Sequence, residues 1–313
     1  MSATTLRSIL NWPAKRFNLT GRTAVVAGPF IWLLLFFLVP FILVVKISFA
    51  DQQLGIPPYT ELTSFADGIW HISLDLSHYA FLFQDSLYFA TYVNSVVVAA
   101  ISTLLCLIIG YPMAYYIARS NPASRNILMM AVMLPFWTSF LIRVYAWIGI
   151  LKNNGLLNNF LMSIGIIHSP IELYHTNTAV YIGMVYSYLP FLVMPLYAHL
   201  VKMDLTLLEA AYDLGAKPWR AFVEITLPLI SQALAAGWLL SFTLSIDDLV
   251  LSAFLSGPGS TTLPLVVFSR VRLGLNPEMN ALATLFIAVV TVGVIAGNYF
   301  MQRAERKRMA MAV

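Results

Sequence analysis

Two adjacent carboxylates, Asp247 and Asp248, lie inside an apolar run that covers residues 229–256. An ionised acid at the centre of a membrane helix costs at least about 2.5–3.5 kcal/mol, so such residues usually face a bundle interior or a water-filled path. There they attract a cation. Neighbouring helix positions point about 100° apart, so the two acids need not share one partner. The alternatives are an ion pair with Arg143, which lies in another apolar run, and a helix-cap role where the run is interrupted.

Aromatic rings could serve the same cation, because a ring face attracts positive charge by roughly 0.5–2 kcal/mol. The candidates are Trp137, Tyr145, Trp147, Tyr186 and Tyr188. Trp and Tyr are also common at membrane–water interfaces, so a belt of interfacial rings is the alternative. Arg143 would repel a cation on such a path, and we expect a structural role for it.

No cluster of residues typical of an enzyme or a metal site occurs in the sequence. The five histidines are scattered, without an H-E-x-x-H pattern, and the G-x-x-x-x-G-K-[ST] loop that binds nucleotide phosphates is absent. The single cysteine, Cys106, excludes an intrachain disulfide and a cysteine metal cluster. We therefore predict no catalytic residue, no metal site, no cofactor bound by this chain and no ATP hydrolysis by the chain itself.

The composition indicates what kind of element must position these residues. Of the 313 residues 59% are hydrophobic and only 10% are charged, and the mean hydropathy is +0.79. A soluble domain carries about 25% charged residues. An ordinary soluble enzyme, a disordered protein and a disulfide-rich secreted domain are thereby excluded, and the chain is predicted to be a multi-pass membrane protein.

Six apolar stretches are long enough to cross a bilayer, which takes about 20 residues. They cover residues 25–47, 90–118, 127–150, 176–201, 229–256 and 280–301. Lipid offers no hydrogen-bond partners, so each stretch is predicted to be a helix, and the fold to be all-α. The predicted organisation is an N-terminal cytoplasmic segment 1–24, a six-span domain 25–302 and a basic tail 303–313.

Positive charges orient the predicted spans. Thirteen Lys and Arg residues lie in the two terminal segments and the loops on their side, whereas the opposite loops hold only Lys152, Arg270 and Arg272. Because Lys and Arg mark cytoplasmic loops, both termini are predicted to be cytoplasmic. These basic residues face lipid headgroups, and the net charge of +4 does not point to nucleic acid. The first span exceeds the 7–15-residue core of a signal peptide and is expected to be a retained anchor.

Residues 48–89 form a long outer segment with five acids and no Lys or Arg. An acidic outer surface could concentrate a cation or meet a basic partner. The alternative is a solvated loop whose acids only keep it soluble.

A cytoplasmic loop over residues 204–228 has the pattern of a rigid elbow. Thr206 and Glu209 have capping-box spacing, and Asp204 is a second candidate cap. The apolar positions Leu207, Leu208, Ala211 and Leu214 fall on one helix face. Gly215 suits a helix C-terminus that needs positive φ, and Pro218 can open the next helix. Such an elbow is suited to docking into a groove on another protein.

The spacing within this elbow resembles the EAA loop of ATP-binding-cassette (ABC) importer permeases. The matching positions are Glu209, Ala210, Ala211, Gly215, Ile225, Leu227 and Pro228. The resemblance implies a type I ABC importer permease (MetI-like) bundle in which this loop is a coupling helix on a separate ATPase. ATP and Mg²⁺ would then be bound by that partner.

Further motifs resemble the permease subunits of bacterial putrescine/spermidine importers. Residues 1 to about 236 resemble the first permease subunit, through 56–62, 137–147 and 151–155, whereas about 237–313 resemble the second, through 241–250, 256–259 and 276–284. The resemblance implies polyamine as cargo, carried across the bacterial inner membrane by alternating access. It also implies a homologous permease subunit, an ATPase dimer and a periplasmic polyamine-binding protein as partners.

The candidate substrate path then comprises Asp247, Asp248, Trp137, Tyr145 and Tyr186. Two alternatives stay open. The chain could belong to an importer of another small solute, or it could be an ion-coupled carrier or channel that works without ATP and uses the two aspartates for protons or sodium. A membrane enzyme has no residue constellation to support it.

Overall fold

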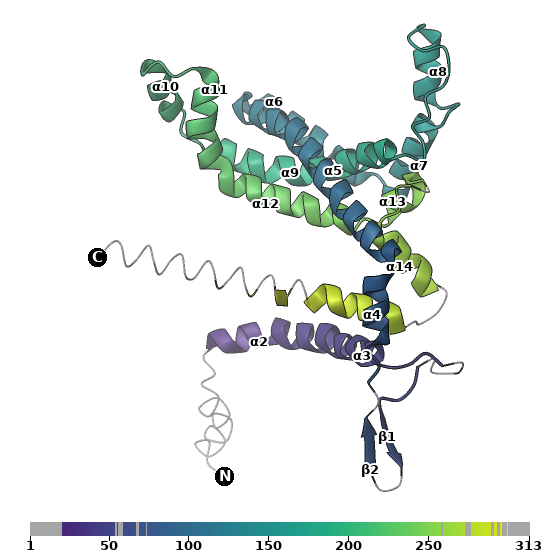
Figure 1. The fold of residues 1–313 in the computed structure, drawn as a ribbon. Coiled ribbons are helices and arrows are strands. Elements are labelled where there is room, and N and C mark those ends of the chain that lie inside the picture. The colour runs from purple at the N-terminus through teal and green to yellow at the C-terminus, as the bar shows by residue number, and fades with distance from the viewer. Residues whose placement is uncertain are drawn as a thin grey trace, which may run out of the picture. The chain divides into compact units, whose positions relative to one another are not determined.

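The computed structural model describes residues 21–53, 55, 59–66, 69–72, 74–257, 259–272, 277–288, 291–292, 295 and 299 (Figure 1). The chain forms two compact units. One combines residues 1–84 with 273–313, and the other covers Asp85–Arg272. Each unit is described by itself below.

The described part of the first unit begins with one long apolar helix. It consists of α2 (Gly21–Leu33), the π-helical turn η1 (Leu34–Leu38) and α3 (Val39–Ser48). Residues Val25–Ser48 are long and apolar enough to cross a membrane, as predicted for 25–47. The π turn ends two residues before Pro40, which lacks a backbone donor and whose ring crowds the carbonyl four residues earlier.

The outer segment of this unit contains the two strands of the described chain. Strands β1 (Thr63–Ala66) and β2 (Ile69–Ile72) form an antiparallel hairpin in which Thr63 pairs with Ile72. Helix α4 (Ser77–Gln84) follows. This hairpin is an exception to the all-α prediction. Residues 277–288 are helical and begin the predicted sixth span, much of which lies outside the described residues.

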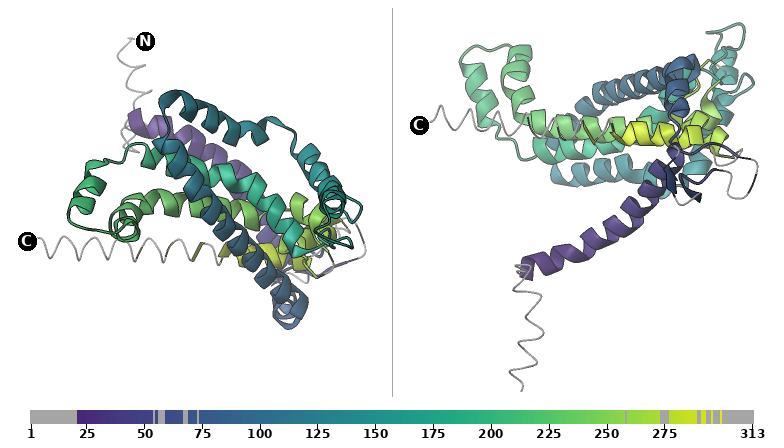
Figure 2. Two further views of the ribbon diagram at one scale, coloured as in Figure 1. Left: turned by 90° about the horizontal axis from the view of Figure 1, so that it is seen from above. Right: turned by 60° about the horizontal axis from the view of Figure 1, so that its bottom comes forward.

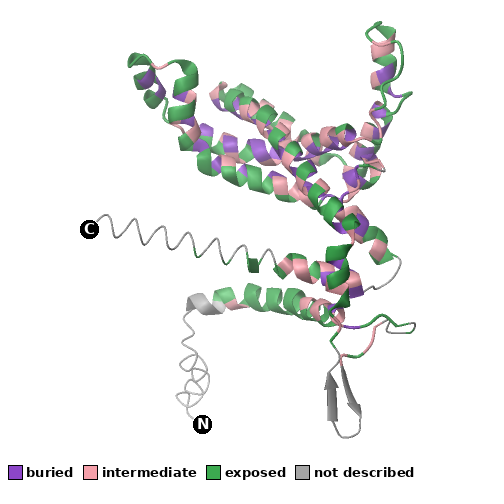
Figure 3. Cartoon of the chain, in the orientation of Figure 1, coloured by how far each residue is buried: buried purple, intermediate pink, exposed green. Residues whose placement is uncertain are grey.

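The second unit holds the packed membrane core. Its main helices are α5 (Ser86–Arg119), α9 (Asn177–Leu200) and α12 (Leu227–Ile246), and each contacts the other two (Figure 2). The core between them is built from buried aliphatic side chains, among them Val98, Met184, Leu192, Leu196, Leu200 and Ile230. Their other faces expose large apolar side chains, the surface that lipid or another membrane subunit would cover (Figure 3).

Shorter elements of this unit interrupt or connect the main helices. In chain order they are α6 (Pro122–Met133), η2 (Leu134–Trp137), α7 (Phe140–Leu151), α8 (Leu156–Ser163), α10 (Thr206–Asp213), α11 (Pro218–Ala221), the π turn η3 (Phe222–Thr226), α13 (Val250–Leu255) and α14 (Leu263–Arg272). The turn η3 stands before Pro228 just as η1 stands before Pro40.

Within the described residues, four helices are long and apolar enough to span a membrane, or five if a bent pair is one span. The prediction of one continuous helix over 127–150 is wrong. The stretch is divided into Pro122–Trp137 and Phe140–Ser163, which meet at 92°. Pro135 supplies the reason, since it lacks a donor and tightens the chain into the 3₁₀ turn η2, after which Thr138 is extended.

The predicted span 229–256 also differs from the structure. Its helix begins earlier, at Pro218, and ends at Ile246, before the separate short helix α13. The spans predicted at 90–118 and 176–201 are confirmed as Ser86–Arg119 and Asn177–Leu200.

Two loops of this unit, one before α9 and one after α13, are held together by a close backbone contact. His175, before α9, has a φ of +63°, and its Nδ1 lies 2.9 Å from the carbonyl oxygen of Ser256, which follows α13. A Cβ atom on Gly257 would stand 2.1 Å from the His175 carbonyl oxygen, so only glycine fits there.

Candidate functional site

The elbow of residues 204–228 has a small core of its own. Leu208, Ala211 and Ala221 are buried, and Met203 and Ile225 pack against them. Met203 follows α9 and Ile225 precedes α12, so this core joins the ends of both membrane helices.

Asp204 caps the elbow helix, because its carboxylate accepts the amide of Thr206 at 3.0 Å. The capping box predicted for Thr206 and Glu209 is wrong, since α10 begins at Thr206 itself and no side chain caps it from Leu205. Gly215 has a φ of +83° and Pro218 opens α11, and both predictions are confirmed.

The predicted apolar face of the elbow divides in two. Leu208 and Ala211 point into its core, whereas Leu207 is exposed and Leu214 is 89% exposed. Trp219 on α11 is 74% exposed as well. A pocket of about 490 Å³ opens between the two helices, with Ala210, Gly215 and Glu224 in its lining. The elbow therefore presents apolar side chains and a hollow that its own chain does not fill.

The two aspartates lie at the break between α12 and α13, but their surroundings differ. Asp248 is 7% exposed, and its Oδ1 accepts the amides of Leu251 at 2.6 Å and Ser252 at 3.4 Å, as a cap of α13 does. Its Oδ2 accepts a hydrogen bond from the Tyr188 hydroxyl of α9. Asp247 follows the last residue of α12 and is exposed.

Arg143 forms no ion pair with either aspartate in the described part of the chain. Its guanidinium lies over the rings of Phe136 and Phe140, at 5.9 and 5.1 Å from their centres, on both sides of the α6–α7 break. Phe136 in turn meets the edge of Phe191 on α9. The break at Thr138 and Ser139 and the break at Asp247 thus both adjoin the middle of α9.

The aromatic candidates divide into contacting and isolated rings. Tyr145 meets Phe254 of α13 edge-on, and Trp147 meets Tyr186 of α9 in the same way. Trp137 is 82% exposed at the α6–α7 break. Of the predicted rings, Tyr188 alone bonds an aspartate, and sequence spacing gave no signal for that pair.

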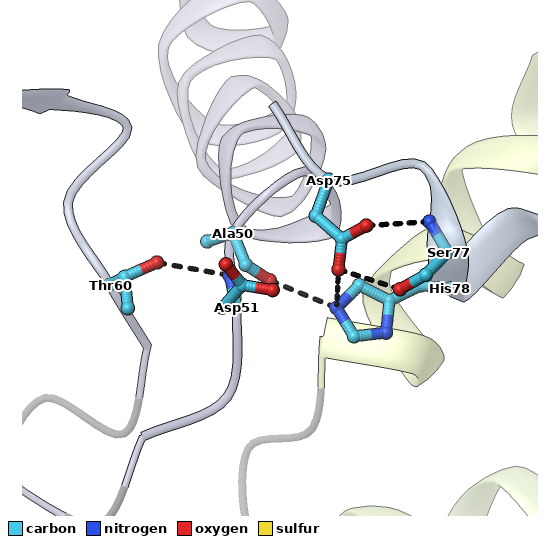
Figure 4. A network of polar contacts seen from close by, with 6 residues as sticks. All are labelled: Ala50, Asp51, Thr60, Asp75, Ser77 and His78. Carbon is cyan, nitrogen blue, oxygen red and sulfur yellow. Dashed lines mark hydrogen bonds and ion pairs between the residues drawn. The ribbon is translucent and has the colours of Figure 1, made fainter. Parts of the chain in front are cut away.

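A polar cluster fixes the base of the outer segment in the first unit (Figure 4). Asp75 accepts the Ser77 hydroxyl at 2.6 Å and the Ser77 amide at 2.7 Å, and these bonds hold the pKa of its carboxyl low, at about 2. The neighbouring Asp75 side chain, with a lesser effect of burial, raises the pKa of Asp51. The His78 Nε2 lies 3.1 Å from the carbonyl oxygen of Ala50.

This cluster was not anticipated from the sequence. One atom from each of Asp51, Asp75 and His78 lies within 4.8 Å of the others, which is close enough to share a metal ion. Asp75 and His78 already have the protein partners given above, so the arrangement holds together through the chain's own groups.

Comparison with known proteins agrees with this architecture. Residues 107–310 match the family described as binding-protein-dependent transport system inner membrane component. The spermidine/putrescine transport system permease protein PotB of Haemophilus influenzae is 39% identical over 215 residues, which are 69% of this chain and 71% of that protein. The putrescine transport system permease protein PotI of Escherichia coli is 58% identical over 113 residues, or 36% of this chain and 40% of that one.

A solved structure supports the fold. One chain of a bacterial ABC transporter that imports the acidic polysaccharide alginate superposes with a TM-score of 0.68. The match covers 96% of this chain and 99% of the other, at 18% sequence identity.

Proposed function

Because this chain belongs to the family of binding-protein-dependent transport system inner membrane components, it is a permease subunit of an ABC importer in the inner membrane, and we propose that it carries putrescine or spermidine. The names of its PotB and PotI relatives support this cargo. They match 69% and 36% of the chain, respectively.

The observation that carries the proposal is the exposed carboxylate of Asp247 at the C-terminal end of α12. Carbonyl groups at a helix C-terminus give that end a partial negative charge. In transporters, interrupted membrane helices use such ends to bind cations. An alkylammonium group would therefore be attracted both by the Asp247 carboxylate and by the end of α12. Asp248 is already engaged by its cap and by Tyr188.

The finer architecture is part of the proposal. Six spans with both termini in the cytoplasm agree with the distribution of Lys and Arg. A second, homologous permease subunit would complete the path, a soluble binding protein would deliver cargo from outside, and lipid would surround the pair. We expect no cofactor on this chain, because ATP and Mg²⁺ would be held by two ATPase subunits.

The elbow would dock on those ATPase subunits. Its exposed Leu214 and Trp219 supply apolar anchors, and its small core links them to α9 and α12. Closure of the ATPase pair would then move both helices and alternate the access of the path, with the elbow carrying the coupling free energy.

The test is uptake of labelled putrescine and spermidine by bacteria that lack one permease subunit, with this chain supplied in each of the two permease positions in turn. Asp247→Asn is expected to raise the KM for uptake about tenfold or more, because a hydrogen bond to a charged group is worth about 1.5–3 kcal/mol. Glu172→Gln removes an exposed carboxylate elsewhere and serves as the matched control. Gly215→Pro should abolish uptake while the chain still inserts.

Three outcomes would count against the proposal. Absence of uptake in both positions, with the chain inserted and bound to the ATPase, would remove polyamine as cargo. An unchanged KM in Asp247→Asn would remove this residue from the path. Uptake that survives loss of the ATPase would favour an ion-coupled carrier.

A further inference from the structure

The elbow connects α9 to α12, and the hydrogen bond between Tyr188 and Asp248 connects α9 to the residues that follow α12. Helices α9 and α12 are joined directly by residues 201–226, and the elbow core fixes Met203 and Ile225 against it. The two helices then pack along their length, with Leu192, Leu196 and Ile230 fully buried in the core. Beyond that contact, the Tyr188 hydroxyl bonds the Asp248 carboxylate.

This bond connects α9 to the element that follows the break in α12. Asp248 accepts two amides of α13 through Oδ1 and the Tyr188 hydroxyl of α9 through Oδ2, so one side chain connects α9 to α13 just after the end of α12. Both partners are almost fully buried, Tyr188 at 8% and Asp248 at 7% exposure. Water therefore cannot replace the bond without entering the core.

We propose that Tyr188 and Asp248 are positioning residues that couple the elbow to the transport break: with this bond in place, α9, α12 and α13 move as one body when the elbow moves. This inference rests on the proposed function, because it assumes an ATPase that pushes on the elbow. Without the bond, α13 would keep its apolar packing against α9 and the His175–Ser256 contact, but it would lose the polar link beside Asp247 that transmits movement of the elbow to the break.

The expected signature is uncoupling rather than simple loss of activity. Tyr188→Phe keeps the ring and removes the hydroxyl, so the core stays filled. Tyr197→Phe is the matched control, since Tyr197 lies on the same helix, packs against the same core and has no bond to Asp248.

The experiment uses the complete importer in proteoliposomes, with its partner permease, ATPase and binding protein. The quantity measured is the number of putrescine molecules taken up per ATP hydrolysed. Tyr188→Phe should lower this ratio at least about fivefold, the lower end of ordinary allosteric couplings, while ATP hydrolysis stays within about twofold of the parent. Tyr197→Phe should leave both values unchanged. A parallel fall of uptake and hydrolysis, or an unchanged ratio, would overturn the proposal.

A second readout does not depend on the cargo. Ala253→Cys places a labelling site on the exposed face of α13, and the native Cys106 thiol is fully buried. A fluorophore there should change its emission when a non-hydrolysable ATP analogue binds the assembled importer, and Tyr188→Phe should abolish that change. A signal that persists in Tyr188→Phe would overturn the coupling role. If the parent importer fails to take up polyamine yet gives the signal, the cargo is wrong and the coupling role stands.

Discussion

Within the residues that the structure describes, two apolar helices are interrupted, and the two interruptions are built in opposite ways. Between α12 and α13, the carboxylate of Asp248 accepts two backbone amides and a tyrosine hydroxyl and is buried. Between η2 and α7, Thr138 and Ser139 are exposed, and no side chain caps the first turn of α7.

The difference matters because lipid cannot satisfy backbone polar groups. Irregular backbone at membrane depth is tolerated only where protein buries it or where it lines a water-filled cavity. The α12–α13 break provides its own partners from this chain. We expect the α6–α7 break to find its partners outside the chain, in water on the transport path or in the second permease subunit.

The largest expected effect concerns the α12–α13 break, whose polar groups find their partners within this chain. Asp248→Ala leaves two amides and the Tyr188 hydroxyl without an acceptor, and each unsatisfied buried group costs about 1–3 kcal/mol. We expect a loss of about 3 kcal/mol in the free energy of unfolding, measured by denaturant titration in detergent. Asp247→Ala, one residue away and exposed, should change it by less than about 0.5 kcal/mol. Equal losses in the two variants would contradict the division of roles between the aspartates.

A smaller effect is expected when the open break is given a cap. Thr138→Asn places a side-chain acceptor two residues before α7, the position that Asp248 holds before α13, and such a cap is worth about 0.5–1 kcal/mol in stability. The isolated chain should gain that amount in its free energy of unfolding, whereas the assembled importer should gain nothing, because its break already has partners. Ser139→Ala, which removes a hydroxyl that makes no capping bond, is the control. An equal gain in both forms would show that the break stays open after assembly.

The smallest expected change in stability concerns the cap of α4 by Asp75, whose carboxylate is more exposed to solvent than that of Asp248. Asp75→Ala removes the acceptor of the Ser77 amide at the start of α4, which is worth about 0.5 kcal/mol at pH 7 because solvent reaches this carboxylate. The folded pKa of Asp75, about 2, lies below its ordinary value of 3.8, so its contribution is present above about pH 4 and is lost only as the pH falls towards 2. The shift in Tm caused by the substitution should therefore be equal at pH 7 and pH 4.5. A shift that halves at pH 4.5 would place the pKa of Asp75 higher.

Much of this architecture could be predicted from sequence, because hydropathy reports burial in lipid directly. The helices Ser86–Arg119 and Asn177–Leu200 lie where apolar composition placed them, and Gly215 has the positive φ that its position after a helix required. The break at Thr138 was missed, and the break at Asp247 and Asp248 was foreseen only in the alternative that gave these residues a helix-cap role. Thr138 and Asp247 lie within continuous apolar runs, and composition does not record where a proline tightens the chain or a carboxylate caps a new helix.

The partners of the candidate site residues could not be predicted for a related reason. Tyr188 and Asp248 are 60 positions apart, and no periodic pattern connects two different helices. The sequence treated Asp247 and Asp248 as equivalent because they are adjacent, although the end of α12 separates their surroundings. Asp204 and Thr206 show the same limit at short range. Both were candidate caps, and only the position where α10 begins shows that Asp204 is the one that accepts a backbone amide.

The contact between Gly257 and His175 also sets an order of assembly. His175 and Ser256 are 81 positions apart, and at about 5–20 residues per second a ribosome needs about 4–16 s to add the later one. During that interval the N-terminal end of α9 is already made, but the loop that contacts it does not yet exist. New chains therefore pass through a stage in which the loop before α9 lacks this contact, and a side chain at position 257 would keep the contact from forming in the finished protein. We therefore expect a substitution of Gly257 to cause faster degradation of the chain by membrane quality-control proteases.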